Sequence, residues 1–216
     1  PVVENEISTP QVSNTTQPNG ITSFEKYPAN NDGNVITFSD TTVGGETLFY
    51  QPVDFVGYSH VQKMIPVDFE LNQRKAHYVI SAFRKAVDGK FNYAAKFNRE
   101  NALNTFITLP ITDASVDTDS PEPDWEYMEE YIKEIEQKYL ETVEQYNRRD
   151  EEILDTLHPD YHDEEPEACD YAEFRVGDLF EIIPTKWYKN DPVVEEEISV
   201  PQVSNTTQPN GITSFE

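Results

Sequence analysis

Residues 125–157 read WEYMEEYIKEIEQKYLETVEQYNRRDEEILDTL, and their apolar residues recur at the spacing of a long helix. Met128 and Ile135 each lie three residues after a member of a row that repeats every seven residues, which is the spacing of a coiled-coil seam. We expect one helix about 50 Å long over 125–158, acting as a spacer or dimerisation helix; the alternative is a helix packed along its own domain. The seven-residue row consists of Trp125, Ile132, Tyr139, Tyr146 and Ile153.

The sequence before this helix predicts a mixed domain over 1–110, and therefore an α+β fold. Runs rich in β-branched and aromatic residues predict strands, and helical spacing of apolar residues predicts two helices, the second with Asn98 as its N-cap. Residues 10–20 are polar and contain Pro18 and Asn19-Gly20, so they predict a loop. The predicted strands are 35–39, 47–50, 61–66 and 105–110, and the predicted helices are 71–87 and 98–103.

The sequence after the helix contains a near-copy of the beginning of the chain. Residues 192–216 match residues 1–25 at 23 of 25 positions, and the two segments are 191 residues apart. Such a period is far too long for a solenoid. It indicates either a tandem duplication or a domain whose sequence has been permuted and overlapped. We expect 174–216 to open another copy of the domain, beginning with a strand over 174–183 that turns at Gly177-Asp178.

The acidic residues of the chain are concentrated in one segment. The 216 residues carry 16 Lys and Arg against 41 Asp and Glu, a net charge of −25. Residues 111–173 hold 23 of the acidic residues and only 4 basic ones, so 111–124 predicts an acidic linker and 159–173 an acidic tether. A large negative charge argues against nucleic acid. Residues 1–110 are nearly neutral, however, and contain a basic cluster that is either a DNA-facing or an ordinary solvated surface: Arg84, Lys85, Lys90, Lys96 and Arg99.

The sequence offers little catalytic chemistry. It has no phosphate-binding glycine motif, no nucleophile elbow and no His-Glu-x-x-His zinc motif. The single Cys169 excludes an internal disulfide and favours a reducing, cytoplasmic location, and no apolar run is long enough to predict a membrane span. A metal site is conceivable only in the acidic tether, where a solvated linker is the alternative, so we expect no metal and no cofactor. The residues concerned are His158, Asp160, His162, Asp163, Glu164 and Glu165.

Polar loops suit recognition better than catalysis. Asn and Gln can pair with adenine in the major groove, Ser and Thr can contact either edge of a base pair, and Lys and Arg contact phosphates. Ordinary turn chemistry is the alternative for the loop at 13–19. The candidate DNA-binding residues are Ser13, Asn14, Thr15, Thr16, Gln17, Asn19, Thr41, Thr42, Lys90, Asn92, Tyr93, Lys96, Arg99, Lys186 and Lys189.

The order of these segments resembles the specificity subunit of type I restriction-modification systems. The resemblance rests mainly on Phe-x-x-Gly-Asp-Leu-Phe at 174–180 and on Leu109-Pro110 followed by an acidic linker and Asp-Trp-x-Tyr-Met at 124–128. Between them, the runs VSNTT at 12–16, GNVITFS at 33–39, TLFYQ at 47–51 and FNYAAKFN at 91–98 also resemble that family.

The resemblance implies a non-catalytic, sequence-specific reader of double-stranded DNA. Such subunits carry two target-recognition domains, each reading half of a split site, with long helices that separate the domains and dock the modification (methyltransferase) subunits. Methylation and cleavage then belong to the modification and restriction subunits. The repeat adds a hypothesis: the target is symmetric and bipartite, or a half-subunit forms a homodimer through the long helix. The two copies of the repeat would also compete for one place in the fold.

Two other functions remain open at this point. A protein-interaction or coiled-coil spacer module, including an acidic mimic of DNA, would act through the helix at 125–157. A metal-dependent enzyme would depend on His158 and His162. Steep salt dependence of DNA binding would distinguish the DNA reader from both.

Overall fold

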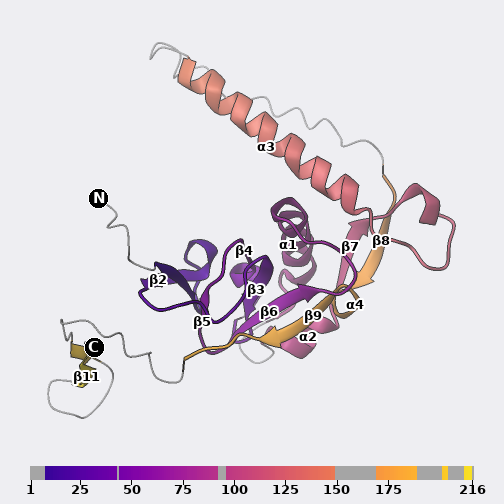
Figure 1. Ribbon diagram of the computed structural model, residues 1–216. Helices are drawn as coiled ribbons and strands as arrows, with labels where there is room; N and C mark the ends of the chain where they lie inside the picture. The colour runs from indigo at the N-terminus through magenta and orange to yellow at the C-terminus, as the bar shows by residue number, and fades with distance from the viewer. Residues whose placement is uncertain are drawn as a thin grey trace.

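The computed structural model describes residues 8–42, 44–91, 96–148, 169–188, 201–203 and 212–215. They form a mixed α+β fold of small sheets and helices (Figure 1), which confirms the predicted fold class. The strands are β1 Thr9–Val12, β2 Ile21–Glu25, β3 Val35–Ser39, β4 Phe49–Gln51, β5 Val56–Gly57, β6 Val61–Pro66, β7 Phe106–Pro110, β8 Tyr171–Arg175, β9 Phe180–Pro184, β10 Pro201–Val203 and β11 Ile212–Phe215. The helices are α1 Gln73–Val87, α2 Arg99–Leu103, α3 Trp125–Arg148 and α4 Val176–Leu179, with short 3-10 turns η1 Pro18–Gly20, η2 Gly45–Thr47 and η3 Asp113–Ser115.

The central sheet has the antiparallel order β4-β3-β6-β9. Its edge strand β9 comes from the segment predicted to open another copy of the domain, and Ile182 of that strand pairs with Met64 of β6. The strand β8 of the same segment pairs with β7, with Phe174 opposite Ile107. Residues 171–188 therefore complete the domain formed by the first part of the chain.

The two faces of the central sheet bury separate apolar clusters. Alternation along a strand sends successive side chains to opposite faces, so Ile36 and Phe38 of β3 face α1, where they join the fully buried Phe83 in the larger core. Val35 faces the other way. It packs with Phe55 in a smaller cluster beneath the three-stranded sheet β2-β1-β5.

The helix α3 starts as predicted and is anchored to the domain at its base. The Asp124 carboxylate caps its first turn by accepting from the Tyr127 N–H at 2.8 Å, and Trp125 stacks on Phe69 with ring centroids 3.7 Å apart. Met128 is fully buried in the larger core. Trp125 and Met128, the first residues of the predicted coiled-coil seam, therefore pack within their own chain. This part of α3 agrees with the alternative of a helix packed on its own domain.

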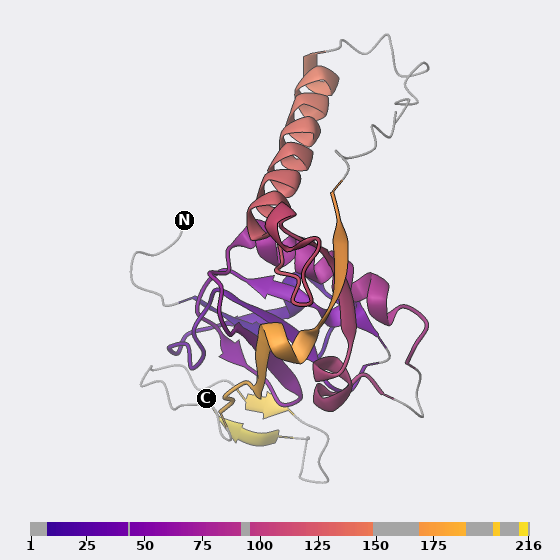
Figure 2. The ribbon, with the colours of Figure 1, turned by 90° about the vertical axis from the view of Figure 1, so that its right-hand side faces the viewer.

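Polar contacts with α1 hold the next part of α3. The Asn72 side chain caps α1 by accepting from the Lys75 N–H, and its amide donates to Glu129 at 2.8 Å. Arg74 of α1 bonds Glu136 at 2.9 Å. Beyond this point α3 extends away from the sheets (Figures 1 and 2). Its large apolar side chains there are exposed: Ile135, Tyr139 and Leu140.

Two predictions near the tether need correction, and the linker keeps its predicted bounds. Residues 171–173 were predicted to belong to the acidic tether, but they begin β8, because Tyr171 and its neighbours pair with β7. The turn predicted at Gly177-Asp178 is the one-turn helix α4. The linker at 111–124 is anchored at both ends by a bridge between Ile111 and Pro123. The predicted end of the long helix, with Ile153, and the first part of the tether lie outside the described residues.

The repeated segment forms the same hairpin in both copies. Residues 10–20 were predicted to be a loop, but Thr9–Val12 is a strand that pairs with β2, because Pro10 and Val12 are buried. Pro10 pairs with Phe24 in the first copy and Pro201 with Phe215 in the second, so the registers are identical.

Candidate nucleic-acid interface

The polar loop between β1 and β2 is fixed to the buried part of the central sheet. Gln51, itself buried, donates both to the Asn19 carbonyl and to the Thr37 hydroxyl, each at 2.9 Å. Asn19 and Gly20 adopt left-handed backbone angles, with φ of 56° and 70°, a conformation these two residue types tolerate best. The loop therefore has one defined shape, with Thr16, Gln17 and Asn19 exposed on its outer side.

The loop meets a second predicted segment. The Asn14 amide donates to the Thr41 hydroxyl at 2.7 Å across 27 residues of sequence. Thr41 in turn lies 3.0 Å from the Ser39 hydroxyl at the end of β3. The fold thus joins two groups of candidate DNA-binding residues into one polar surface, which extends from the β1–β2 loop to the start of the β3–β4 loop.

A third predicted segment lies beside that surface. Thr42 forms a β-bridge with Phe97, whose N–H donates to the Thr42 carbonyl at 3.0 Å. This bridge places Lys96 and Arg99, on either side of Phe97, next to the polar loops. Asn98 caps the helix α2 that begins at Arg99, as predicted, by accepting from the Asn101 N–H.

The remaining candidates are not part of this surface or cannot be placed. Lys186 follows β9, where Asn31 bonds both its N–H and its carbonyl at 2.9 Å. Lys90 is exposed in the turn after α1. Asn92, Tyr93 and Lys189 lie outside the described residues.

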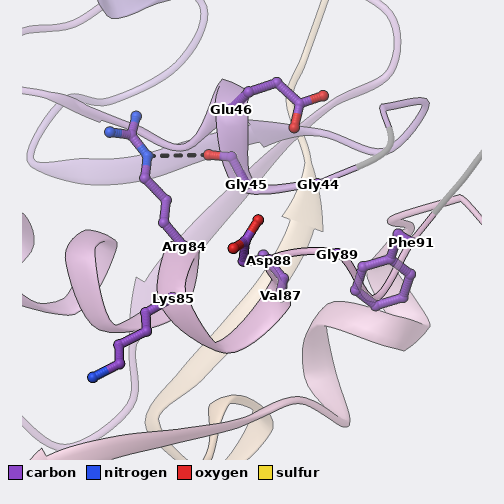
Figure 3. A pocket seen from close by; sticks show the side chains of 9 residues that line it. All are labelled: Gly44, Gly45, Glu46, Arg84, Lys85, Val87, Asp88, Gly89 and Phe91. Carbon is purple, nitrogen blue, oxygen red and sulfur yellow. Dashed lines mark hydrogen bonds between the residues drawn. The ribbon is translucent and has the colours of Figure 1, made fainter.

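Arg84, a member of the predicted basic cluster, has a structural role. It lines an open cavity of about 590 Å³ between η2 and the end of α1 (Figure 3). Its guanidinium donates to the Gly45 carbonyl at 3.1 Å and to the Leu48 carbonyl at 2.6 Å. Lys85, Glu46 and Asp88 also line the cavity, so two acidic side chains balance the two basic ones and leave no excess of positive charge for a phosphate. The cavity therefore does not have the chemistry of a DNA-backbone site.

Sequence reasoning missed a histidine next to the polar surface. His60 Nδ1 lies 3.2 Å from Asp40 Oδ1, and the Asp40 N–H donates to the His60 carbonyl. Asp40 directly precedes Thr41, so His60 lies at the same end of the sheet. The signal available in the sequence was the short polar turn Tyr58-Ser59-His60 immediately before the predicted strand 61–66.

Tyrosines and the single cysteine meet where α3 leaves the domain. Burial raises the pKa of Tyr78 and of Tyr127, and a hydrogen bond with Cys169 is the main cause that raises the pKa of Tyr171. The Asn72 hydrogen bond lowers the pKa of the Glu129 carboxyl. The tyrosines thus stay neutral and the glutamate charged, a combination that favours a stable joint between α1, α3 and β8 over acid–base catalysis.

The structure does not test the proposed metal ligands at 158–165, which lie outside the described residues. In the part of the chain that is described, no three His, Cys, Asp or Glu side chains are grouped so that they could hold a metal ion. Within that same part, no helix combines the length and the apolar character needed to cross a membrane.

Comparison with known families identifies the domain. Residues 2–145 match the family model described as the Type I restriction modification DNA specificity domain, so the chain belongs to this family. Neither the curated proteins nor the solved structures include a significant match. The match contains the polar loops, the basic segment at 96–99 and most of α3.

Family membership confirms the predicted resemblance and gives the general activity. The domain is a non-catalytic specificity element that recognises target DNA in a type I restriction-modification system. Its partners are accordingly DNA and the modification and restriction subunits of that complex.

Proposed function

We propose that this domain reads one half-site of a bipartite target in double-stranded DNA through a surface built from three segments. These segments are the loop 13–20, Thr41 with Thr42, and the turn 96–99. The observation that carries the proposal is the hydrogen bond from Asn14 to Thr41, because it unites residues that the sequence marked separately for DNA recognition.

The chemistry of the surface matches that of base readout beside a phosphate backbone. Its centre consists of amides and hydroxyls, which can both donate and accept hydrogen bonds at base edges in the major groove. Lys96 and Arg99 at its border supply the positive charge that phosphates require. Gln51 fixes the loop from below, so little conformational freedom is lost when the loop binds.

The arrangement of charge weakens the objection raised by a net charge of −25. Of the 23 acidic residues of segment 111–173, seven lie on α3, which extends away from the sheets (Figure 2). Charges farther apart than about 10 Å are largely screened at 0.1 M salt. DNA on the polar surface therefore meets the nearly neutral part of the chain.

The outer part of α3 serves, in this proposal, as the spacer and as the surface for a partner. Trp125 and Met128 are occupied within the chain, so the available apolar residues are Ile135, Tyr139 and Leu140. Ile132, half-buried, borders them. The side chain of Tyr146 and the whole of Ile153, the other predicted members of the row, lie outside the described part of the chain.

Selection from random double-stranded DNA tests the proposal. The chain is used with and without a modification subunit, at two salt concentrations, beside the double variant Asn14→Ala, Thr41→Val and the control Ser81→Ala. Ser81 is exposed on α1, and its hydroxyl bonds only within that helix, to the His77 carbonyl.

The expected result is enrichment of a short defined sequence by the wild type and the control, and its loss in the double variant. Affinity should also fall steeply as salt rises. If no sequence is enriched under any condition, half-site reading by this chain is wrong and α3 becomes the main functional surface. Two unrelated half-sites in the complete target would contradict a symmetric target.

A further inference from the structure

We propose that His60 reads a base edge in the recognised DNA and that Asp40 is a positioning residue that sets which atom His60 presents. This inference rests on the proposed function and adds one specificity residue to it. Neither residue is among the DNA-binding candidates predicted from the sequence, and Asp40 bears a charge that would itself repel DNA.

Asp40 is held in place from three directions. Its Oδ2 accepts from the Gln62 amide at 2.8 Å, its Oδ1 lies 3.2 Å from His60 Nδ1, and its N–H donates to the His60 carbonyl at 2.9 Å. The Asp40 side chain is 25% exposed and the His60 side chain 60% exposed. The carboxylate is therefore largely enclosed, whereas the imidazole reaches solvent.

The hydrogen bond from Gln62 to Asp40 leaves the other polar atom of the Gln62 side chain without a partner. Gln62 is buried, and because the carboxylate can only accept, its NH₂ group must face Asp40. Its Oε1 is then buried without a hydrogen-bond partner among the described residues, a loss of about 1–3 kcal/mol. Buried polar atoms without a partner are uncommon in native proteins, and this one is the cost at which Gln62 holds the Asp40 carboxylate beside His60.

The backbone of His60 fixes how the imidazole is presented. His60 has a φ of 69°, a left-handed conformation that His, like Asn and Asp, adopts more readily than most residues other than Gly. The turn is closed by the Val61 N–H, which donates to the Tyr58 carbonyl at 3.3 Å. This closed turn holds the imidazole at the start of β6, beside Asp40.

The pairing with Asp40 determines the hydrogen-bonding character of His60. A carboxylate accepts only, so in the neutral form of the imidazole the proton resides on Nδ1, and Nε2 is then an acceptor that faces away from Asp40. In the major groove, an acceptor complements the exocyclic amino group of adenine or cytosine and opposes the carbonyl oxygens of guanine and thymine.

The surroundings place this acceptor where DNA is expected. Thr41 follows Asp40 in the chain and bonds Asn14. His60 therefore borders the polar surface where β3 ends and the antiparallel strand β6 begins. The recognised base pair is thus expected to neighbour the one that Asn14 contacts.

The experiment repeats the DNA selection with variants of the turn. His60→Gly removes the imidazole and suits the left-handed backbone, Asp40→Ala removes the positioning carboxylate, and His77→Ala is the control, since His77 is an exposed histidine of α1. The wild type should prefer adenine or cytosine at one position, and His60→Gly should relax that position about tenfold while leaving the others unchanged.

Asp40→Ala should relax the same position, and adding it to His60→Gly should cause no further loss. Imidazole ¹⁵N chemical shifts of the free protein should show the Nδ1–H tautomer in the wild type and a mixture in Asp40→Ala. If Asp40 is merely structural, the variant will lower the melting temperature and weaken binding to all sequences equally, which would overturn its positioning role.

The outcomes separate this inference from the proposed function. A wild type that selects no sequence overturns the proposed function. A wild type and a His60→Gly variant that select the same sequence with the same preferences overturn the role of His60 alone.

Discussion

The two copies of the repeated hairpin share one local structure but not one environment. β1–β2 and β10–β11 have the same register, and the irregularity falls at equivalent places, between Gln11 and Val12 and between Gln202 and Val203. β1 also pairs in parallel with β5, whereas β10 and β11 form a two-stranded sheet within the described residues. The local sequence thus determines the hairpin, and contact with the rest of the domain determines which copy becomes part of it.

The two copies of the hairpin differ at a residue that contacts the chain beyond the hairpin, Thr9 in the first copy and Val200 in the second. The buried Thr9 donates its hydroxyl to the Tyr27 carbonyl at 2.8 Å. The second copy has Val200 at this position, and valine cannot donate a hydrogen bond. This difference favours the first copy beside β5, although competition between the copies for that place stays a prediction.

Engineered disulfides give the sharpest test of the comparison. Gln11 of β1 lies opposite Val56 of β5, so cysteines there should cross-link completely within one molecule in a Cys169→Ser background. The matched pair places cysteines at Gln202 and Val56 and should give no cross-link. Electrophoresis without reductant checks both, and equal cross-linking of the two pairs would show that the hairpins exchange places.

Truncation of equivalent valines should give the next largest difference. Val12 is buried in the smaller cluster, so Val12→Ala should lower the free energy of unfolding by about 2 kcal/mol. Val203→Ala should change it by less than about 0.5 kcal/mol, because β10 pairs only with β11 among the described residues. Urea denaturation measures both, and a similar loss in the two variants would contradict the distinction.

Substitution of Asn14 and of its equivalent Asn205 tests which copy of the loop contacts DNA. Asn14→Ala should weaken binding to the selected sequence about tenfold, because the loop loses both a base contact and its bond to Thr41. Asn205→Ala should leave affinity unchanged. Fluorescence anisotropy with a duplex of the selected sequence measures both, and a loss in Asn205→Ala would place the second loop on DNA as well.

Exchange of the residues that differ should have the smallest effect. Thr9→Val removes the hydrogen bond to the Tyr27 carbonyl and should cost about 1 kcal/mol of unfolding free energy. Val200→Thr should not affect the unfolding of the main domain. A neutral Thr9→Val variant in urea denaturation would show that this bond does not favour the first copy.

The sequence predicted elements well where local signals dominate. The strands 35–39 and 61–66 and the cap at Asn98 were located correctly, because period-two alternation and capping chemistry are local. Thr9–Val12 was missed because its polar surroundings resemble a loop, and its burial depends on β5. Met128 fits a heptad seam by spacing, but only the tertiary structure shows that it belongs to the core.

The candidate site shows the same division. Composition indicated the polar loop, Thr41 with Thr42, and the basic residues separately. Their union depends on a contact between Asn14 and Thr41 and on a bridge between Thr42 and Phe97, both of which join distant parts of the chain. His60 was overlooked because a histidine in a short polar turn is a weak signal, and it becomes notable only beside Asp40.

The Asn72 side chain both caps α1 and bonds Glu129 of α3. It therefore helps to set the angle at which α3 leaves the domain. The 24 residues of α3 form a rod about 36 Å long. A tilt of roughly 10° at its base moves the far end by about 6 Å, close to two base-pair steps. With α3 in the proposed role of spacer, a single side chain would influence how many base pairs separate the half-sites, without touching a base.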